Sequence, residues 1–80
     1  MNKMLKDLLR AEGDFVFEHE DQIMEKFVYV PYPELLSVYF NEETVKLYFW
    51  DTDTGQHYTD EISAVDYSNW KEEVLNVKKL

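Results

Sequence analysis

Between residues 34 and 62, hydrophobic and polar positions alternate with the period of two that is typical of β-strands. The alternation predicts three strands, at about 34–40, 44–50 and 56–62. Polar residues at 41–44 and 51–55 separate the strands, and Gly55 can adopt the positive φ that tight turns often need. The expected structure is a three-stranded antiparallel β-meander.

One register satisfies the three strands together, because pairing Phe40 with Val45 and Phe49 with Tyr58 collects the apolar residues on one face. That face is expected to hold Leu36, Val38, Phe40, Val45, Leu47, Phe49, Tyr58 and Ile62. The other is expected to hold Leu35, Tyr39, Lys46, Tyr48, Trp50, His57, Thr59 and Glu61. We expect the first face to form part of the core.

The period changes at Ser63, where Ser63 and Asp66 match a capping box in its acidic form. Apolar residues then recur at helical spacing, at Tyr67, Trp70, Val74 and Val77. The pattern predicts a helix over 64–78 that covers the apolar sheet face, with Lys78 and Lys79 suiting the negative end of its dipole.

A second apolar stripe near the start of the chain consists of Met4, Leu5, Leu8 and Leu9. It predicts a helix over 3–12, with Asn2 as N-cap and Gly13 as the stop. The segment 14–30 has a mixed pattern: Phe15 to Phe17 has strand composition, whereas 20–27 fits a helical turn or two. We expect a short extended segment, then a short helix, then extended chain from Phe27 to Val30. The fold class is therefore α+β.

The chain has 80 residues and no cysteine, which indicates a single small domain, residues 1–80, without disulfides or thiolate metal sites. The first ten residues carry basic charges but lack the apolar run of a signal peptide, and no apolar stretch is long enough to span a membrane. A cytoplasmic location is the expectation.

Acidic residues dominate the middle of the chain. The net charge is −9, and between Glu12 and Asp66 there are 14 acidic residues against Lys26 and Lys46. Such a field repels nucleic acid and anionic membranes and attracts basic proteins, although acidity can also serve solubility alone. We therefore expect a basic protein partner and no direct contact with nucleic acid or membrane.

The sequence motifs for metal binding or catalysis are weak. Asp51, Asp53 and Gly55 suggest a calcium loop, but an EF-hand needs glycine at the sixth position and glutamate at the twelfth, where Gln56 and Ile62 stand. A structural hairpin turn is the better interpretation. The two histidines lack partners for metal binding or catalysis: His19 fits a solvated acidic face, and His57 fits a cross-strand pair with Trp50. No catalytic residue, metal site, cofactor or enzymatic activity is predicted.

The aromatic row Tyr39, Tyr48 and Trp50 lies on the sheet face that the C-terminal helix cannot cover. One interpretation is that the N-terminal helix and the segment 15–30 fold over this face and complete the core. The other is that part of the face stays open as a protein-binding patch with an acidic rim.

A short, cysteine-free, aromatic-rich and strongly acidic α+β chain resembles the small bacteriophage inhibitors that imitate DNA, such as some anti-CRISPR proteins and uracil-DNA glycosylase inhibitors. The resemblance implies that carboxylates replace phosphates against the basic groove of a host nucleic-acid-binding protein. The residues expected to bind the partner are Glu42, Glu43, Asp51, Asp53, Asp60, Glu61, Tyr48 and Trp50. An immunity protein that neutralises a basic toxin and a small adaptor domain are the alternatives, and a homodimer is left open.

Overall fold

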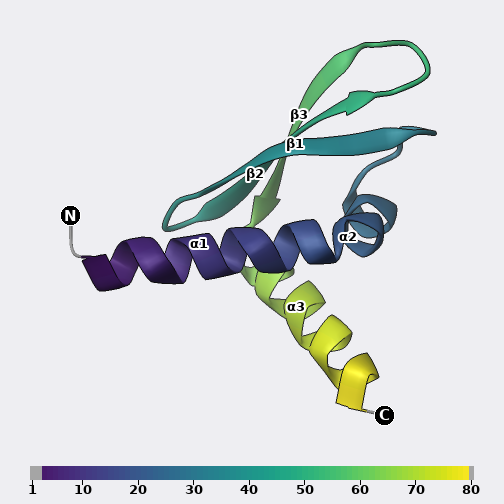
Figure 1. The fold of residues 1–80 in the computed structure, drawn as a ribbon. Coiled ribbons are helices and arrows are strands. Elements are labelled where there is room, and N and C mark those ends of the chain that lie inside the picture. The colour runs from purple at the N-terminus through teal and green to yellow at the C-terminus, as the bar shows by residue number, and fades with distance from the viewer. Residues whose placement is uncertain (1–2, 80) are drawn as a thin grey trace.

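The computed structural model describes the backbone of residues 3–79 and the side chains of residues 10–76. Three helices and three strands follow one another along the chain (Figure 1). They are α1 (Lys3–Glu18), α2 (Glu20–Phe27), β1 (Pro33–Phe40), β2 (Thr44–Asp51), β3 (His57–Ser63) and α3 (Ala64–Lys79). The predicted α+β class, with a meander followed by a C-terminal helix, is confirmed.

The strands form one antiparallel sheet in the order β1-β2-β3. The expected pairing of β2 with β3 is confirmed from Val45 opposite Ile62 to Phe49 opposite Tyr58. The pairing of β1 with β2 is also confirmed at Phe40 opposite Val45 and at Val38 opposite Leu47. Strict alternation at these positions leaves no second register that buries the apolar residues.

The first half of β1 departs from the prediction because the register shifts between Leu35 and Ser37. Leu35, not Leu36, lies opposite Phe49, so placing Leu36 on the core face and Leu35 on the other was wrong. Leu35 is 5% exposed and Leu36 is 44% exposed. A β-bulge places one extra residue in a strand and thereby exchanges the faces of the residues before it.

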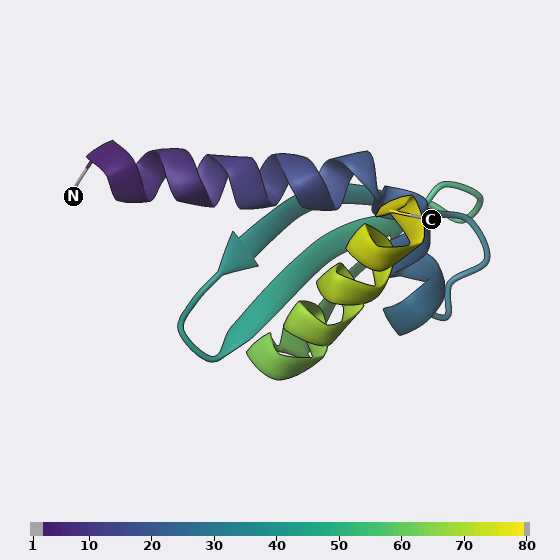
Figure 2. The same cartoon turned by 90° about the horizontal axis from the view of Figure 1, so that it is seen from below.

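All three helices lie on the same side of the sheet (Figure 1), and Figure 2 shows them from that side. The core therefore forms between the helices and one sheet face. Val45, Leu47 and Phe49 from β2 are buried there with residues of every helix, among them Val16, Ile23 and Trp70.

Helix α1 extends past Gly13 to Glu18, so the predicted stop at Gly13 and the extended segment at Phe15 to Phe17 were both wrong. Glycine inside a helix costs about 0.5–1 kcal/mol. Burial of Val16, which is fully enclosed, and the packing of Phe15 against the core offset this cost. The predicted N-cap Asn2 lies outside the described backbone, and the stripe from Met4 to Leu9 lies outside the described side chains.

His19 separates α1 from α2, and its interpretation as part of a solvated face was wrong, because the side chain is 3% exposed. Its Nδ1 lies 2.8 Å from the carbonyl oxygen of Phe15, which also accepts the backbone amide of His19 at 3.2 Å. The predicted short helix is confirmed as α2, which includes Phe27, so starting the extended segment at Phe27 was wrong. Val28 directly after the helix has extended backbone angles.

Helix α3 begins at Ala64 as predicted. Ser63 Oγ accepts a hydrogen bond of 3.1 Å from the Asp66 amide, which confirms the N-cap. Tyr67, Trp70 and Val74 are buried along the face that meets the core. Val77, Lys78 and Lys79 lie outside the described side chains.

Candidate functional site: the open face of the sheet

The sheet face opposite the helices carries the aromatic row. Tyr39 and Tyr48 are 59% and 37% exposed, and Trp50 is partly exposed. The interpretation in which the N-terminal part of the chain covers this face was wrong, since every helix packs on the other side (Figures 1 and 2). We call the residues that β1, β2 and β3 present on this side the open face: Glu34, Ser37, Tyr39, Thr44, Lys46, Tyr48, Trp50, His57, Thr59, Glu61 and Ser63.

Trp50 is held in place by its neighbours on both adjacent strands. Its indole Nε1 donates a hydrogen bond of 3.0 Å to Glu34 Oε1 on β1. On β3, the ring of His57 lies 5.8 Å from the indole ring, so the predicted cross-strand pair is confirmed. A tryptophan fixed in this way offers a rigid apolar surface and loses little conformational entropy on binding.

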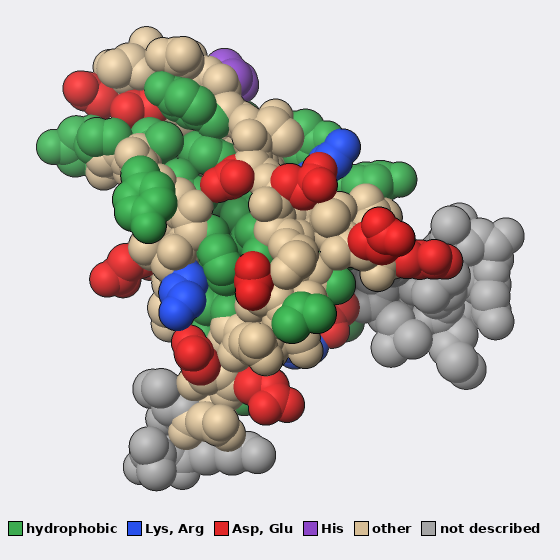
Figure 3. All heavy atoms as spheres, turned by 180° about the vertical axis from the view of Figure 1, so that it is seen from behind, with side chains coloured by type: hydrophobic (Ala, Val, Ile, Leu, Met, Phe, Trp, Pro, Cys, Tyr) green, Lys and Arg blue, Asp and Glu red, His purple; other side chains and the backbone are tan. Residues whose placement is uncertain are grey.

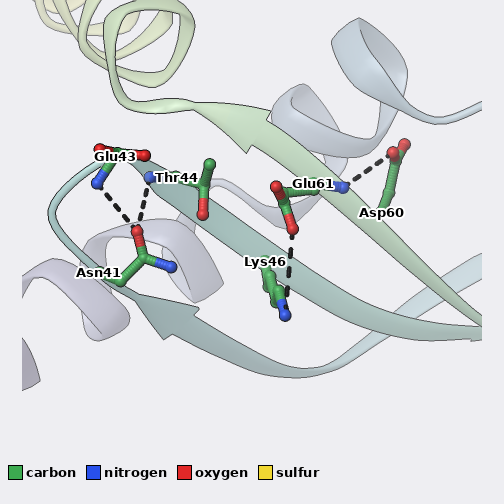
Figure 4. Close-up of polar contacts among 6 residues, drawn as sticks. All are labelled: Asn41, Glu43, Thr44, Lys46, Asp60 and Glu61. Atoms are coloured by element: carbon green, nitrogen blue, oxygen red, sulfur yellow. Dashed lines mark hydrogen bonds and ion pairs between the residues drawn. The ribbon is translucent and has the colours of Figure 1, made fainter.

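The open face carries little net charge. Lys46 Nζ lies 3.9 Å from Glu61 Oε2, and both side chains are partly solvated (Figure 4). Such an exposed ion pair contributes at most about 1 kcal/mol. With Glu34 as the other acid, the face combines aromatic rings, hydroxyl groups and only a few charges.

The turns place the other predicted acids at opposite ends of the sheet. Glu42 and Glu43 lie exposed in the turn from β1 to β2, where Asn41 Oδ1 accepts the amides of Glu43 and Thr44 at 2.9 and 2.8 Å (Figure 4). Asp53 lies in the turn from β2 to β3. Eight residues of β2 separate the two turns, a distance of about 26 Å at 3.3 Å per residue.

Asp51 and Asp53 belong to a structural turn, as the sequence indicated. Asp51 is 5% exposed, and its Oδ1 accepts the Asp53 amide at 2.8 Å. Gly55 follows with φ 77°, a conformation that favours glycine. Asp51 therefore shapes the turn from inside, and Asp53 is the carboxylate that remains exposed there.

Asp60 and Glu61 diverge, as neighbouring residues of a strand do. Glu61 belongs to the open face, whereas Asp60 lies opposite Leu47 on the helix side. Asp60 Oδ1 accepts the amide of Glu61 at 2.9 Å (Figure 4). The predicted acids thus lie in the two turns and on both faces of β3, rather than in one patch.

Most acids that the sequence analysis did not select lie on the helices. They are Glu12, Asp14, Glu18, Glu20, Asp21, Glu25, Asp66, Glu72 and Glu73. The described side chains of the helices include only three bases, Arg10, Lys26 and Lys71. In Figure 3 acidic side chains are spread among apolar ones, with isolated basic groups between them. The acidic run 18–21 was the available signal for this charge.

Glu12 is the exception among these acids, because it joins α1 to α3. Its carboxylate accepts hydrogen bonds from the Tyr67 hydroxyl and from Lys71 Nζ, which also lies over the Phe15 ring. Burial raises the pKa of Glu12, but these hydrogen bonds and the charge of Lys71 outweigh burial and hold the pKa below 4.5. Burial and the nearby carboxylate raise the pKa of Tyr67. This cluster stabilises the packing of the helices.

Within residues 10–76, no group of three or more His, Cys, Asp or Glu side chains is arranged to hold a metal ion. Among the helices that the structure describes, none is long and apolar enough to cross a membrane. Comparisons of the chain with protein-family models, curated proteins and solved structures found no match.

Proposed function

We propose that this protein is an inhibitor that binds, through its open face, a basic nucleic-acid-binding surface of another protein and so keeps DNA or RNA away from that surface. The observation that carries the proposal is the row of Tyr39, Tyr48 and Trp50, which no helix covers. Exposed aromatic residues on a rigid sheet are typical anchors of protein interfaces.

The acidic residues orient the partner and select for basic proteins. Glu34 and Glu61 lie on the open face, Glu42 and Glu43 at one end of the sheet, and Asp53 at the other. Arginine side chains of a partner can stack on the aromatic rings and pair with these carboxylates. A net charge of −9 raises the association rate with basic proteins and opposes direct binding of nucleic acid.

The partner therefore contacts an aromatic centre with an acidic rim, and the acids of the helices act at longer range. This division differs from mimicry by a continuous row of carboxylates. It agrees with the resemblance to small phage inhibitors, which is a resemblance of composition and charge.

The first test is capture of partners from a bacterial lysate at low and at high salt, followed by competition with DNA and RNA. The proposal predicts a basic nucleic-acid-binding protein whose capture weakens with salt and whose nucleic acid is displaced. Recovery of no basic protein at either salt concentration would contradict it. Capture of a basic toxin without displacement of nucleic acid would support neutralisation of that toxin instead.

Charge-reversal variants distinguish the acids at the ends of the sheet from the acids on the helices. Glu42→Lys with Glu43→Lys reverses two charges at one end of the sheet, and Glu72→Lys with Glu73→Lys makes the same change in charge on α3. We expect the first pair of substitutions to speed dissociation of the complex, and so to weaken it more than the second pair does. Equal effects would show that only net charge matters.

A further inference from the structure

A groove lies between α1 and the free edge of β1, and it shares Tyr39 with the open face. It is lined by Arg10 and Gly13 of α1 and by Val38, Tyr39 and Phe40 of β1, and its volume is about 290 Å³. Figure 2 shows α1 running beside β1 and the two elements diverging toward the N-terminal part of the helix. This volume is close to the lower end of about 300–1,000 Å³ for ligand sites, so a short segment fits better than a bulky ligand.

The backbone at this edge has hydrogen-bonding groups to offer. The hydrogen bond of 3.0 Å from the Asn41 amide to the Thr44 carbonyl sets the phase of the β1–β2 ladder. In an antiparallel ladder the bonded pairs alternate, so Tyr39 bonds to Lys46 while Val38 and Phe40 direct their N–H and C=O groups away from β2. These groups face the free edge along which the groove runs.

Other parts of the sheet edges carry features that oppose the addition of a strand. Pro33 lacks an amide at the start of β1, and the bulge at Leu36 interrupts the regular edge that follows. On β3, Asp60 Oδ1 already accepts the outward amide of Glu61. The stretch from Val38 to Phe40 has none of these features.

The described lining of the groove has the opposite charge to the protein as a whole. Among the described residues that line it, Arg10 is the one with a charged side chain, in a chain with a net charge of −9. Gly13 adds space, because a Cβ atom placed there would meet no neighbouring atom within 4 Å. A carboxylate is the group that a guanidinium binds best, through paired hydrogen bonds.

We propose that this groove binds an extended peptide segment of a partner protein, which adds to β1 as a fourth strand and places a carboxylate beside Arg10. The backbone of the segment pairs with Val38 and Phe40, as in other cases of β-strand addition. The carboxylate belongs to an Asp or Glu side chain or to a C-terminus. This site does not depend on the proposed function of the open face.

The test uses two libraries of random decapeptides, one displayed with a free C-terminus and one displayed internally, selected on the folded protein. Amide hydrogen exchange then maps the selected peptides. Binding at the groove slows exchange at Val38 and Phe40 and leaves Tyr39, whose amide is already bonded to β2, nearly unchanged. Enrichment in the first library identifies a C-terminal carboxylate, and enrichment of Asp or Glu in the second identifies a side chain.

Two pairs of variants give the controls. Arg10→Gln should weaken binding about tenfold, whereas Lys26→Gln, which also removes one charge from a helix, should change it less than twofold. Gly13→Gln should weaken binding at least tenfold by filling the groove, whereas Gly13→Ala should leave it nearly unchanged. Selection of no peptide, unchanged exchange at Val38 and Phe40, or binding by Arg10→Gln and Gly13→Gln as tight as that of wild type would overturn the proposal.

Discussion

The contact between Glu12, Tyr67 and Lys71 predicts a specific loss of stability in Glu12→Gln. Glutamine has nearly the same shape and can still accept a hydrogen bond from Tyr67, but it loses the charge that Lys71 needs. Hydrogen bonds to charged groups contribute about 1.5–3 kcal/mol when buried. The side chains of Glu12 and Lys71 are 35% and 31% exposed, so solvent screening reduces this to about 1–2 kcal/mol.

The effect should depend on pH in a defined direction. The pKa of Glu12 is lower in the folded protein than its ordinary value of 4.5, so the carboxylate stabilises the fold above that value. The stabilisation is lost as pH falls through the folded pKa. Wild type and Glu12→Gln should therefore differ at pH 7 and converge in acid, below the folded pKa.

Urea unfolding at pH 7 and at a series of lower pH values, followed by far-ultraviolet circular dichroism, measures the effect. With a slope of about 1 kcal/mol per molar urea for a small protein, the midpoint of Glu12→Gln should be lower by about 1–2 M at pH 7. Glu72→Gln, at an exposed position of α3, is the control and should shift the midpoint little. Equal stability of Glu12→Gln and wild type at pH 7, or a difference that does not shrink as the pH is lowered below 4.5, would refute the reasoning.

Four further substitutions test other parts of the fold by the same unfolding assay. Leu47→Ala empties a fully buried position in β2 and should lower the free energy of unfolding by about 2–5 kcal/mol; a loss below 1 kcal/mol would contradict its central place in the core. Asn41→Ala removes the acceptor of two turn amides and should cost about 0.5–1.5 kcal/mol; unchanged stability would show that water replaces it. Alanine should stabilise the protein by about 0.5–1 kcal/mol at Gly13 and destabilise it by about 1 kcal/mol or more at Gly55, where φ is positive; the same sign at both sites would contradict the assigned backbone.

The sheet could be predicted in detail where alternation was strict. From Val38 to Phe40 and along β2 and β3, only one register buries the apolar residues, and the structure has that register. Leu35 and Leu36 are both apolar, so the pattern allowed either to face the core. The bulge decides between them, and a pattern with period two cannot anticipate an inserted residue.

The N-terminal region shows how tertiary packing overrides local preference. Gly13 favoured a helix end, and the composition of Phe15 to Phe17 favoured a strand. A continuous helix forms instead, because it buries Val16 in the core on the helix side of the sheet. His19, between acidic neighbours, looked like a surface residue. Its burial comes from contacts at the end of α1, where Nδ1 lies 2.8 Å from the carbonyl oxygen of Phe15 and the two ring centroids are 4.4 Å apart.

The members of the candidate site were partly predictable, but their openness was not. Alternation placed Tyr39, Tyr48 and Trp50 on one face, and it separated Asp60 from Glu61. Whether helices cover that face depends on the direction in which the chain leaves the sheet. The distance between the two turns likewise prevents the acids from forming one patch.

Affinity for the captured basic protein tests the central claim most directly, when measured for wild type, for Tyr39→Ser with Tyr48→Ser, and for Tyr29→Ser. Tyr29 is 96% exposed and lies outside the sheet, so it matches the change in chemistry without touching the open face. The account predicts that the double variant binds at least 30-fold more weakly, as expected for the loss of about 2 kcal/mol at interface anchors, and that Tyr29→Ser binds like wild type. Equal binding by all three proteins, with the double variant folded, would contradict the assignment of the open face as the contact surface.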